Sequence, residues 1–158
     1  GLQADPAMAT LAAEAGVPII IMHDQKILSA ERLIPDIVRE LARRIDQALA
    51  AGVRWERIIV DPGFGFGKTP DLNLLLLRCL SELRVLGRPI LVGTSRKSMI
   101  GHVLGTPPDD RVEGTAATVA LAIANGADIV RVHDVPQMVR VVRMTDAVVR
   151  GWRGFSSA

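Results

Sequence analysis

The stretch "RIIVDPGFGFGKTP", residues 57–70, joins a short apolar run to a loop with glycine at alternate positions. Glycine-rich loops that follow strands often bind phosphate, and two sequence patterns describe most of them. A P-loop requires Gly, four residues and then Gly-Lys-Ser/Thr, but Pro62 replaces the first glycine and has no N–H to donate. The dinucleotide-binding pattern G-x-G-x-x-G also fails, because Lys68 occupies its last position. The surroundings of the loop must therefore explain it.

The composition indicates one domain with an aliphatic core. The chain has 158 residues, of which 49% are apolar and only 3% aromatic, as in helix-covered parallel sheets. The net charge is +2 and the arginines are scattered, so no nucleic-acid partner is expected. Cys79 is the single cysteine, which excludes a disulfide framework and predicts a small core residue. With no apolar run of ~18 residues and no signal-peptide pattern, we expect a cytoplasmic protein without membrane contact.

Four apolar runs predict β-strands. Each run is apolar throughout, which is typical of strands buried on both faces of a parallel sheet. The runs are "VPIIIMH" (17–23), "RIIVDPG" (57–63), "RPILVGTS" (88–95) and "DIVRVHDV" (128–135).

Helices are predicted before, between and after these runs, and most of them end at a glycine. Apolar residues at helical spacing run from 34 to 49, and Thr69-Pro70 has the form of an N-cap followed by the first helical residue. The predicted helices run from Asp5-Pro6 to Gly16, over 34–49 up to Gly52, from Thr69-Pro70 to Gly87, over 112–125, and from Pro136 to Gly151.

A helix before four strand–helix units predicts an α/β fold with four parallel strands. A spacing of about forty residues is normal for a (β/α)₈ TIM barrel, but a whole barrel needs about 250 residues and eight strands. The chain would therefore form half of a barrel. A doubly wound sheet of four strands is the alternative.

Polar residues stand at the end of every predicted strand. They are Met22-His23, Asp61, the segment 94–98, and Arg131 with His133. Because the carboxyl ends of parallel strands meet at one edge of a sheet, we expect these residues to form one site. Taken singly, Asp61 could cap a turn and His23 could be a buried core histidine.

Lys97, Arg131 and His133 together predict an anion pocket. Arg131 and His133 are two residues apart, so on a strand they share one face. Lys97 alone could be a surface residue at the start of a short helix, and either of the other two could serve packing. Three cationic or donor side chains at one sheet edge make an anion site the better interpretation.

The glycine loop suggests a flat ligand beside this anion site. Gly63, Gly65 and Gly67 would let a flat molecule lie against the backbone, with Phe64 or Phe66 as a packing face. The ionised carboxylate of Asp61 can accept from two adjacent N–H donors, such as the guanidine-like edge of a ring. Lys97 could meet a ring carbonyl. The residues thus predict a site for a nitrogen-rich heterocycle.

Four motifs in order resemble those of dihydropteroate synthase. They are "DPGFGFGKT", "LVGTSRKSMIG", "GTPPDDRVEGTAA" and "RVHDV", and "MH" at 22–23 fits as well. The resemblance extends from the first residues to about Gly151. It implies a (β/α)₈ barrel that condenses 6-hydroxymethyl-7,8-dihydropterin diphosphate with 4-aminobenzoate in folate biosynthesis, releasing diphosphate. It also implies Mg²⁺ as cofactor and a homodimer of the full-length enzyme.

The resemblance implies roles for individual residues. Asp61 would bind the pterin, and Lys97 would contact the pterin and border the aminobenzoate site. Ser98 would hold the benzoate carboxylate at a helix start, and Arg131 and His133 would bind the diphosphate. Lys97, Arg131 and His133 are accordingly the expected catalytic residues. Further substrate-binding residues implied in this way are Met22, Phe66 and Gly93.

The chain, residues 1–158, resembles the C-terminal half of such a barrel, because "GLQADPAM" is similar to the segment after the fourth strand in that family. The residue that ligates Mg²⁺ is then expected outside this chain. Two alternatives stay open. One is a domain like the methyltetrahydrofolate:corrinoid methyltransferases, although "SRKS" and "RVHDV" suit a diphosphate that methyl transfer lacks. The other is a truncated or paralogous chain that binds pterin without catalysis.

Overall fold

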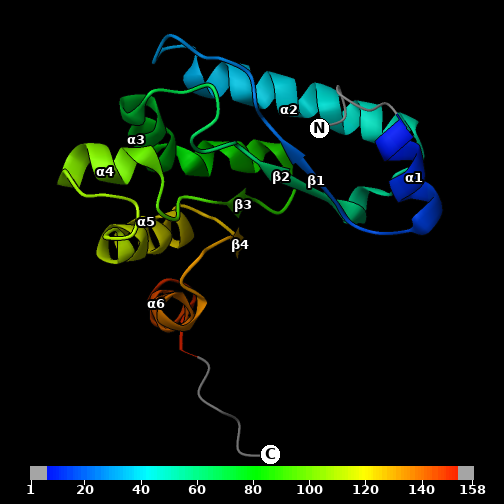
Figure 1. Cartoon of the computed structure of the whole chain (residues 1–158). Coiled ribbons are helices and arrows are strands. Elements are labelled where there is room, and N and C mark those ends of the chain that lie inside the picture. The colour runs from blue at the N-terminus through cyan, green and yellow to red at the C-terminus, as the bar shows by residue number, and fades with distance from the viewer. Residues whose placement is uncertain (1–6, 153–158) are drawn as a thin grey trace, which may run out of the picture.

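The computed structural model describes residues 7–152, which form an α/β fold (Figure 1). The elements are α1 (Ala7–Ala15), β1 (Ile19–Met22), α2 (Leu33–Ala50), η1 (Trp55–Arg57), β2 (Ile58–Asp61), α3 (Pro70–Arg78), η2 (Leu80–Leu86), β3 (Leu91–Val92), α4 (Ser98–Leu104), α5 (Val112–Ala124), β4 (Ile129–Val130) and α6 (Val135–Arg150). The predicted helix start at Asp5-Pro6 lies outside the described residues. Within residues 7–152, no helix combines the length and the apolar character that crossing a bilayer requires.

All strands of the described part run parallel, as predicted. β1 pairs with β2, which places Met22 opposite Asp61, and β3 pairs with β4, which places Leu91 opposite Ile129. One parallel bridge, from Val60 to Ile90, links the two pairs, so the strand order follows the chain order. The carboxyl ends of β1 to β4 therefore lie next to one another, in sequence.

The strands are shorter than predicted, and the outer two are not buried on both faces. Pro18, Pro62 and Pro89 flank the first three strands and have no N–H for a ladder. Ile20 of β1 is 49% exposed and Ile129 of β4 is 38% exposed. The expectation of two buried faces is thus wrong for β1 and β4, because the described residues leave the face that carries Ile20 or Ile129 partly uncovered.

Most predicted helices are present, but the one expected from Thr69 to Gly87 is broken. Thr69 caps α3 as predicted, since its Oγ1 accepts from the N–H of Leu72 at 3.3 Å. α3 ends at Arg78, and after the half-buried Cys79 the chain tightens into the 3₁₀ helix η2. A 3₁₀ helix repeats every three residues, which buries three leucines of this segment on one side. They are Leu80, Leu83 and Leu86.

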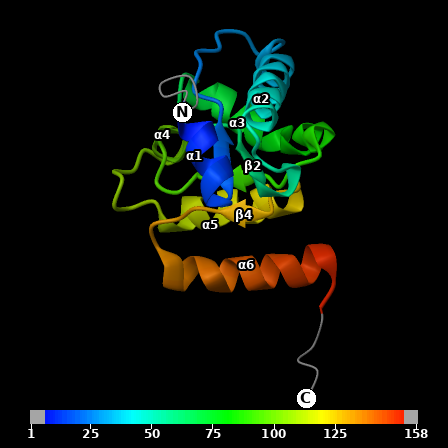
Figure 2. The same cartoon turned by 90° about the vertical axis from the view of Figure 1, so that its right-hand side faces the viewer.

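The helices lie in layers around the strands. α2 covers one side and buries Leu33, Ile37, Leu41 and Ala48 in the main core. α5 lies on the other side, and α6 packs beyond α5, at the opposite end of the molecule from α2 (Figures 1 and 2). A small second core of Val119, Ile123 and Met138 joins α5 to α6.

A buried arginine on α2 fixes the end of β1. Arg44 is only 1% exposed, and its guanidinium donates to the carbonyl of Met22 at 2.5 Å and to the carboxylate of Asp24 at 2.7 Å. Its Nε donates to Glu40 at 2.7 Å. Because these bonds join α2 to the residues on either side of His23, the position of the strand end depends on this one side chain.

Replacing Arg44 should therefore destabilise the fold far more than replacing its neighbour. Arg44→Met removes the donor that reaches the Met22 carbonyl and the Asp24 carboxylate, and we expect a loss of about 3 kcal/mol in the free energy of unfolding. Arg43 bonds the same Glu40 but is 43% exposed, so Arg43→Met should cost below about 1 kcal/mol. Urea denaturation of both variants measures the difference. Equal losses would contradict the anchoring role of Arg44.

Candidate functional site

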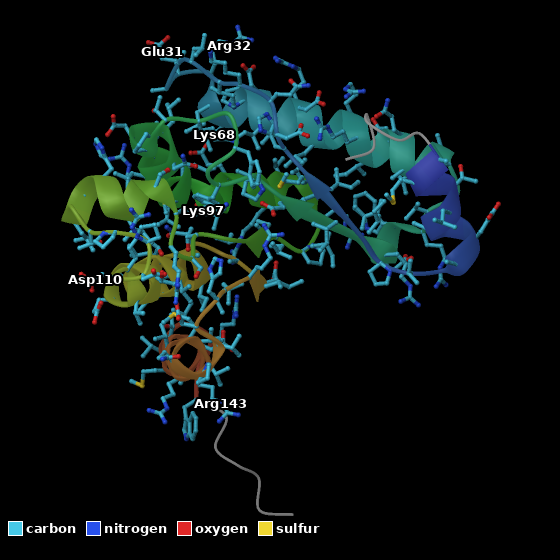
Figure 3. The ribbon with its side chains drawn as sticks, viewed as in Figure 1. Glu31, Arg32, Lys68, Lys97, Asp110 and Arg143 are labelled. Carbon is cyan, nitrogen blue, oxygen red and sulfur yellow. The ribbon has the colours of Figure 1, made fainter. Side chains whose placement is uncertain are left out.

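The predicted site residues meet at the carboxyl edge of the strands. Met22 and Asp61 are register partners and therefore point to the same face. The N–H of Arg131 donates to the carbonyl of Val92 at 2.9 Å, which extends the ladder of β3 and β4 by one residue. Lys97 lies on the loop after β3, beside α3 and α4 (Figure 3). The site is thus assembled from the ends of all four described strands.

Asp61 is a buried carboxylate at the centre of this edge. It is 1% exposed, and its Oδ1 accepts from the N–H of Gly63 at 2.7 Å. The Nη2 of Arg131 lies 3.6 Å from Oδ2, which is an ion pair and too long for a hydrogen bond. Within residues 7–152, Oδ2 accepts no hydrogen bond. Burial raises the pKa of Asp61, while Gly63, Arg131, Lys68 and Lys97 oppose the rise.

Gly93 gives Arg131 its path to Asp61. A Cβ at Gly93 would lie 3.2 Å from Nη2 and 3.3 Å from Nε of Arg131, so any side chain there would press on the guanidinium. Arg131 therefore extends across β3 toward the carboxylate on β2. The strand-face argument for Arg131 and His133 does not apply as stated, because β4 ends at Val130 and both residues come after it.

Lys97 lies over the glycine loop and meets an aromatic ring. Its Nζ is 4.7 Å from the ring centroid of Phe66, a cation–π contact on a ring that is 39% exposed. A Cβ at Gly65 would come within 3.1 Å of the Cδ of Lys97. Gly65 thus makes room for the stem of Lys97, and the ring of Phe66 receives its ammonium group.

The turn that presents Lys97 is held by two arginines that the sequence analysis does not single out. Arg96 has a positive φ of 58°, a conformation that costs energy for a residue other than glycine. Its guanidinium bonds Asp134 at 2.6 Å and Asp109 at 3.0 Å. Arg111 donates to the carbonyl of Arg96 at 2.9 Å. No local sequence pattern predicts this turn, because it depends on contacts between segments far apart in the chain.

His133 and Ser98 lie at the border of the cluster. The Oγ of Ser95 accepts from the backbone N–H of His133 at 3.1 Å. The same Oγ lies 2.9 Å from Nδ1 of the His133 ring. A Ser95 hydroxyl that donates to Nδ1 leaves Nε2 of this exposed ring directed to solvent. Ser98 is exposed and is the first residue of α4, with Lys97 as its N-cap.

Two of the three loop glycines lie directly against the backbone of another segment of the protein. At Gly63, with φ of 74°, a Cβ would stand 1.8 Å from the carbonyl oxygen of His23, and at Gly67 it would stand 2.3 Å from that of Gln25. The loop therefore packs its backbone on the segment after β1. The suggestion that these glycines clear space for a flat ligand is wrong, because protein backbone fills that space at Gly63 and Gly67 and the stem of Lys97 fills it at Gly65.

Lys68, at the position of a P-loop lysine, turns inward. Its Nζ donates to the carbonyls of Gly63 and Phe66, both at 3.0 Å, and lies 3.1 Å from Nδ1 of His23. His23 is 1% exposed, so it is a buried histidine that supports the loop. Desolvation, with the charges of Lys68 and Arg44, lowers the pKa of His23 to about 4. His23 is therefore neutral at pH 7.

Among the described residues, no group of three or more His, Cys, Asp or Glu side chains is placed to hold a metal ion. Asp61, the buried carboxylate of the site, faces Arg131, a cation. These residues by themselves do not fit a divalent cation.

The pKa of His23 predicts a loss of stability in acid. The folded pKa of about 4 is below the ordinary value of 6.5, so the unfolded chain takes up a proton first as the pH falls. The contribution of His23 to the free energy of unfolding should have its full value above about pH 7. It should fall by at most about 3 kcal/mol as the pH drops toward 4. Other groups titrate in this range, so the comparison is between variants.

His23→Gln retains an acceptor for Lys68 and should lessen this acid slope, measured by urea denaturation at pH 7 and pH 4.5. His102→Gln changes an exposed histidine and is the matched control, which should keep the slope of the unaltered chain. An unchanged slope in His23→Gln would contradict a buried, neutral His23.

Comparison with known proteins identifies a family and relatives that this chain resembles. The sequence matches the family described as "Pterin binding enzyme" over residues 1–133. It is 47% identical over 149 residues to the dihydropteroate synthase of Bacillus subtilis (strain 168), covering 94% of this chain and 52% of that protein. The chain thus spans about half the length of the curated relatives it matches.

Solved structures agree with the sequence comparison. Dihydropteroate synthase from Clostridium difficile, determined in the presence of pteroic acid, gives a TM-score of 0.91 at 45% identity, covering 95% of this chain and 57% of that one. The Anaplasma phagocytophilum enzyme with bound 6-hydroxymethylpterin-monophosphate gives 0.86 at 34%, covering 92% and 60%. These similarities confirm the resemblance to dihydropteroate synthase that the motifs indicate, and the chain belongs to the family of pterin-binding enzymes.

Proposed function

We propose that this chain is the C-terminal half of a (β/α)₈ barrel with dihydropteroate synthase activity, a cytoplasmic transferase of folate biosynthesis. It would supply the pterin and diphosphate sites, and a second half-barrel would complete the enzyme. The open edges of β1 and β4 support this division, because among the described residues each of these strands pairs on one side only, and a further strand could pair on the other.

The observation that carries the proposal is the buried carboxylate of Asp61 with a cation on one side. Among the described residues, no group donates a hydrogen bond to its Oδ2, so this oxygen can accept from a ligand. A pterin presents adjacent N–H donors on one ring edge. The ring of Phe66 and the ammonium of Lys97 lie next to it, as an aromatic face and a donor for a ring carbonyl. The ligands of the two solved relatives, pteroic acid and a pterin monophosphate, both contain this ring.

The cations of the site suit the expected reaction. The bond between the pterin methylene carbon and a diphosphate oxygen breaks, and its electron pair leaves with the diphosphate. The amine nitrogen of 4-aminobenzoate bonds to the same carbon and releases a proton. Arg131 and Nε2 of His133 would stabilise the charge that develops on the leaving group. Ser98 would hold the carboxylate of 4-aminobenzoate, and Met22 and Gly93 would border the pterin.

Two further expectations stay proposals. The residue that ligates Mg²⁺ would lie outside this chain, and among the described residues no group of three or more His, Cys, Asp or Glu side chains is placed to hold the ion. A homodimer would need a surface for its partner. α6 exposes the apolar side chains of Met144 and Val148, and Trp152, which follows this helix, is exposed as well. A second protein could cover these side chains.

Asp61→Asn tests the pterin site directly. The variant keeps the size of the side chain but loses the charged acceptor, so its affinity for 6-hydroxymethylpterin diphosphate should fall about tenfold or more in calorimetric titration. Asp46→Asn, at an exposed position of α2, is the matched control and should bind like the unaltered chain. Equal affinities of Asp61→Asn and the control would exclude Asp61 as the pterin acceptor. Absence of saturable binding to the folded, unaltered chain would contradict a preformed site in this half.

A further inference from the structure

The ammonium of Lys68 is fully engaged inside the protein. An ammonium has three N–H donors and no acceptor. Two of them reach the carbonyls of Gly63 and Phe66, each at 3.0 Å, and the third matches Nδ1 of His23 at 3.1 Å. With all donors used, Lys68 has no N–H left for a ligand, in contrast to the lysine of a P-loop.

The surroundings of Lys68 favour this arrangement. His23 is neutral at pH 7, so its Nδ1 can carry the lone pair that accepts from the ammonium. Asp61 and Asp24 are the carboxylates whose charges favour the protonated form of Lys68, against the burial that lowers its pKa to about 8. A cation enclosed in this way has little freedom to move, and the two carbonyls that it holds are fixed with it.

Those two carbonyls belong to the residues that carry the site. Gly63 and Phe66 are the ends of a turn closed by an N–H to carbonyl bond of 3.2 Å. The N–H of Gly63 donates to Asp61, and the ring of Phe66 meets Lys97. One internal cation therefore connects the partner of the buried carboxylate to the aromatic ring that faces the ligand side.

We propose that Lys68 is a positioning residue, which holds the loop 63–67 in its binding conformation from the inside and raises pterin affinity without touching the pterin. This inference rests on the proposed function of the site. The loop has a second support in Asn73, which accepts from the N–H of Gly65 at 2.9 Å. Asn73 acts on the middle of the loop, whereas Lys68 acts on Gly63, whose N–H donates to Asp61, and on Phe66, whose ring meets Lys97.

Lys68→Met tests the proposal, since methionine has a similar length but no charge and no N–H. Two quantities are measured, the amide hydrogen exchange of residues 62–69 in the ligand-free chain and the affinity for 6-hydroxymethylpterin diphosphate. We expect faster loop exchange, unchanged exchange in α2 and α5, and an affinity about tenfold lower. Lys26→Met removes the same charge from an exposed lysine nearby and should change neither quantity.

A chemical rescue separates positioning from general damage to the fold. Lys68→Cys in a Cys79→Ala background, alkylated with 2-bromoethylamine under denaturing conditions and refolded, forms a thioether amine of the length of lysine. It should regain both loop protection and affinity, whereas the same protein alkylated with iodoacetamide, which adds a neutral amide, should not. This comparison decides the question even if Lys68→Met fails to fold.

Different experimental results would overturn the positioning role of Lys68 and the proposed function of the site. If Lys68→Met binds the pterin diphosphate as tightly as the unaltered chain, or if the aminoethylated protein does not recover, the positioning role is overturned. If the unaltered chain binds no pterin while its loop exchange still depends on Lys68, then the proposed function fails and Lys68 supports the loop for another reason. That result would equally overturn the stated role of Lys68 in pterin affinity.

Discussion

A carboxylate buried at the end of a strand requires cations around it. Three separate loops place cations near Asp61. The side chain is 1% exposed, and the positive charges that act on it are those of Arg131, Lys68 and Lys97. An isolated ionised carboxylate in such a place would cost several kcal/mol or take up a proton. The arrangement of the loops after β2, β3 and β4 reflects this need, because each contributes one of these cations.

The cations differ in their distance from the ligand side. Arg131 and Lys97 are at the surface of the site, one lying across Gly93 and the other against Phe66. Lys68 lies beneath the glycine loop with His23, and Arg44 fixes the strand end below it. An outer group that can meet a charged substrate is thus supported by an inner group whose bonds are satisfied within the protein. Such support keeps binding groups in place before a ligand arrives.

Much of the fold and of the site was predictable from the sequence. Apolar runs, glycines after helices and the Thr69-Pro70 cap locate most elements within a few residues, because these signals are local. The meeting of Asp61, Lys97 and Arg131 at one edge follows from the parallel strand order, whereas the turn that presents Lys97 does not. The glycine loop indicated Phe66 only as one of two possible packing faces, and Gly93 could be named only through the resemblance to a known family.

The features that the sequence did not indicate depend on contacts between distant segments. Lys68 has the sequence position of a phosphate ligand, yet it turns inward because the carbonyls of Gly63 and Phe66 and the ring of His23 surround it. The positive φ of Arg96 depends on Asp134 and Arg111, which lie on other segments of the chain. Leucine at every third residue, as at Leu80, Leu83 and Leu86, fits an α-helix as well as a 3₁₀ helix, so the spacing did not predict where α3 ends.

The central proposal is that this chain by itself carries a formed pterin site at the ends of its strands. Amide chemical shifts of the ¹⁵N-labelled chain, recorded during titration with 6-hydroxymethylpterin diphosphate, test this claim most directly. We predict saturable shifts concentrated in residues 61–67, 93–98 and 131–133, with α1 and the outer turns of α6 unchanged. A well-folded chain that shows no saturable shifts in these segments would contradict it.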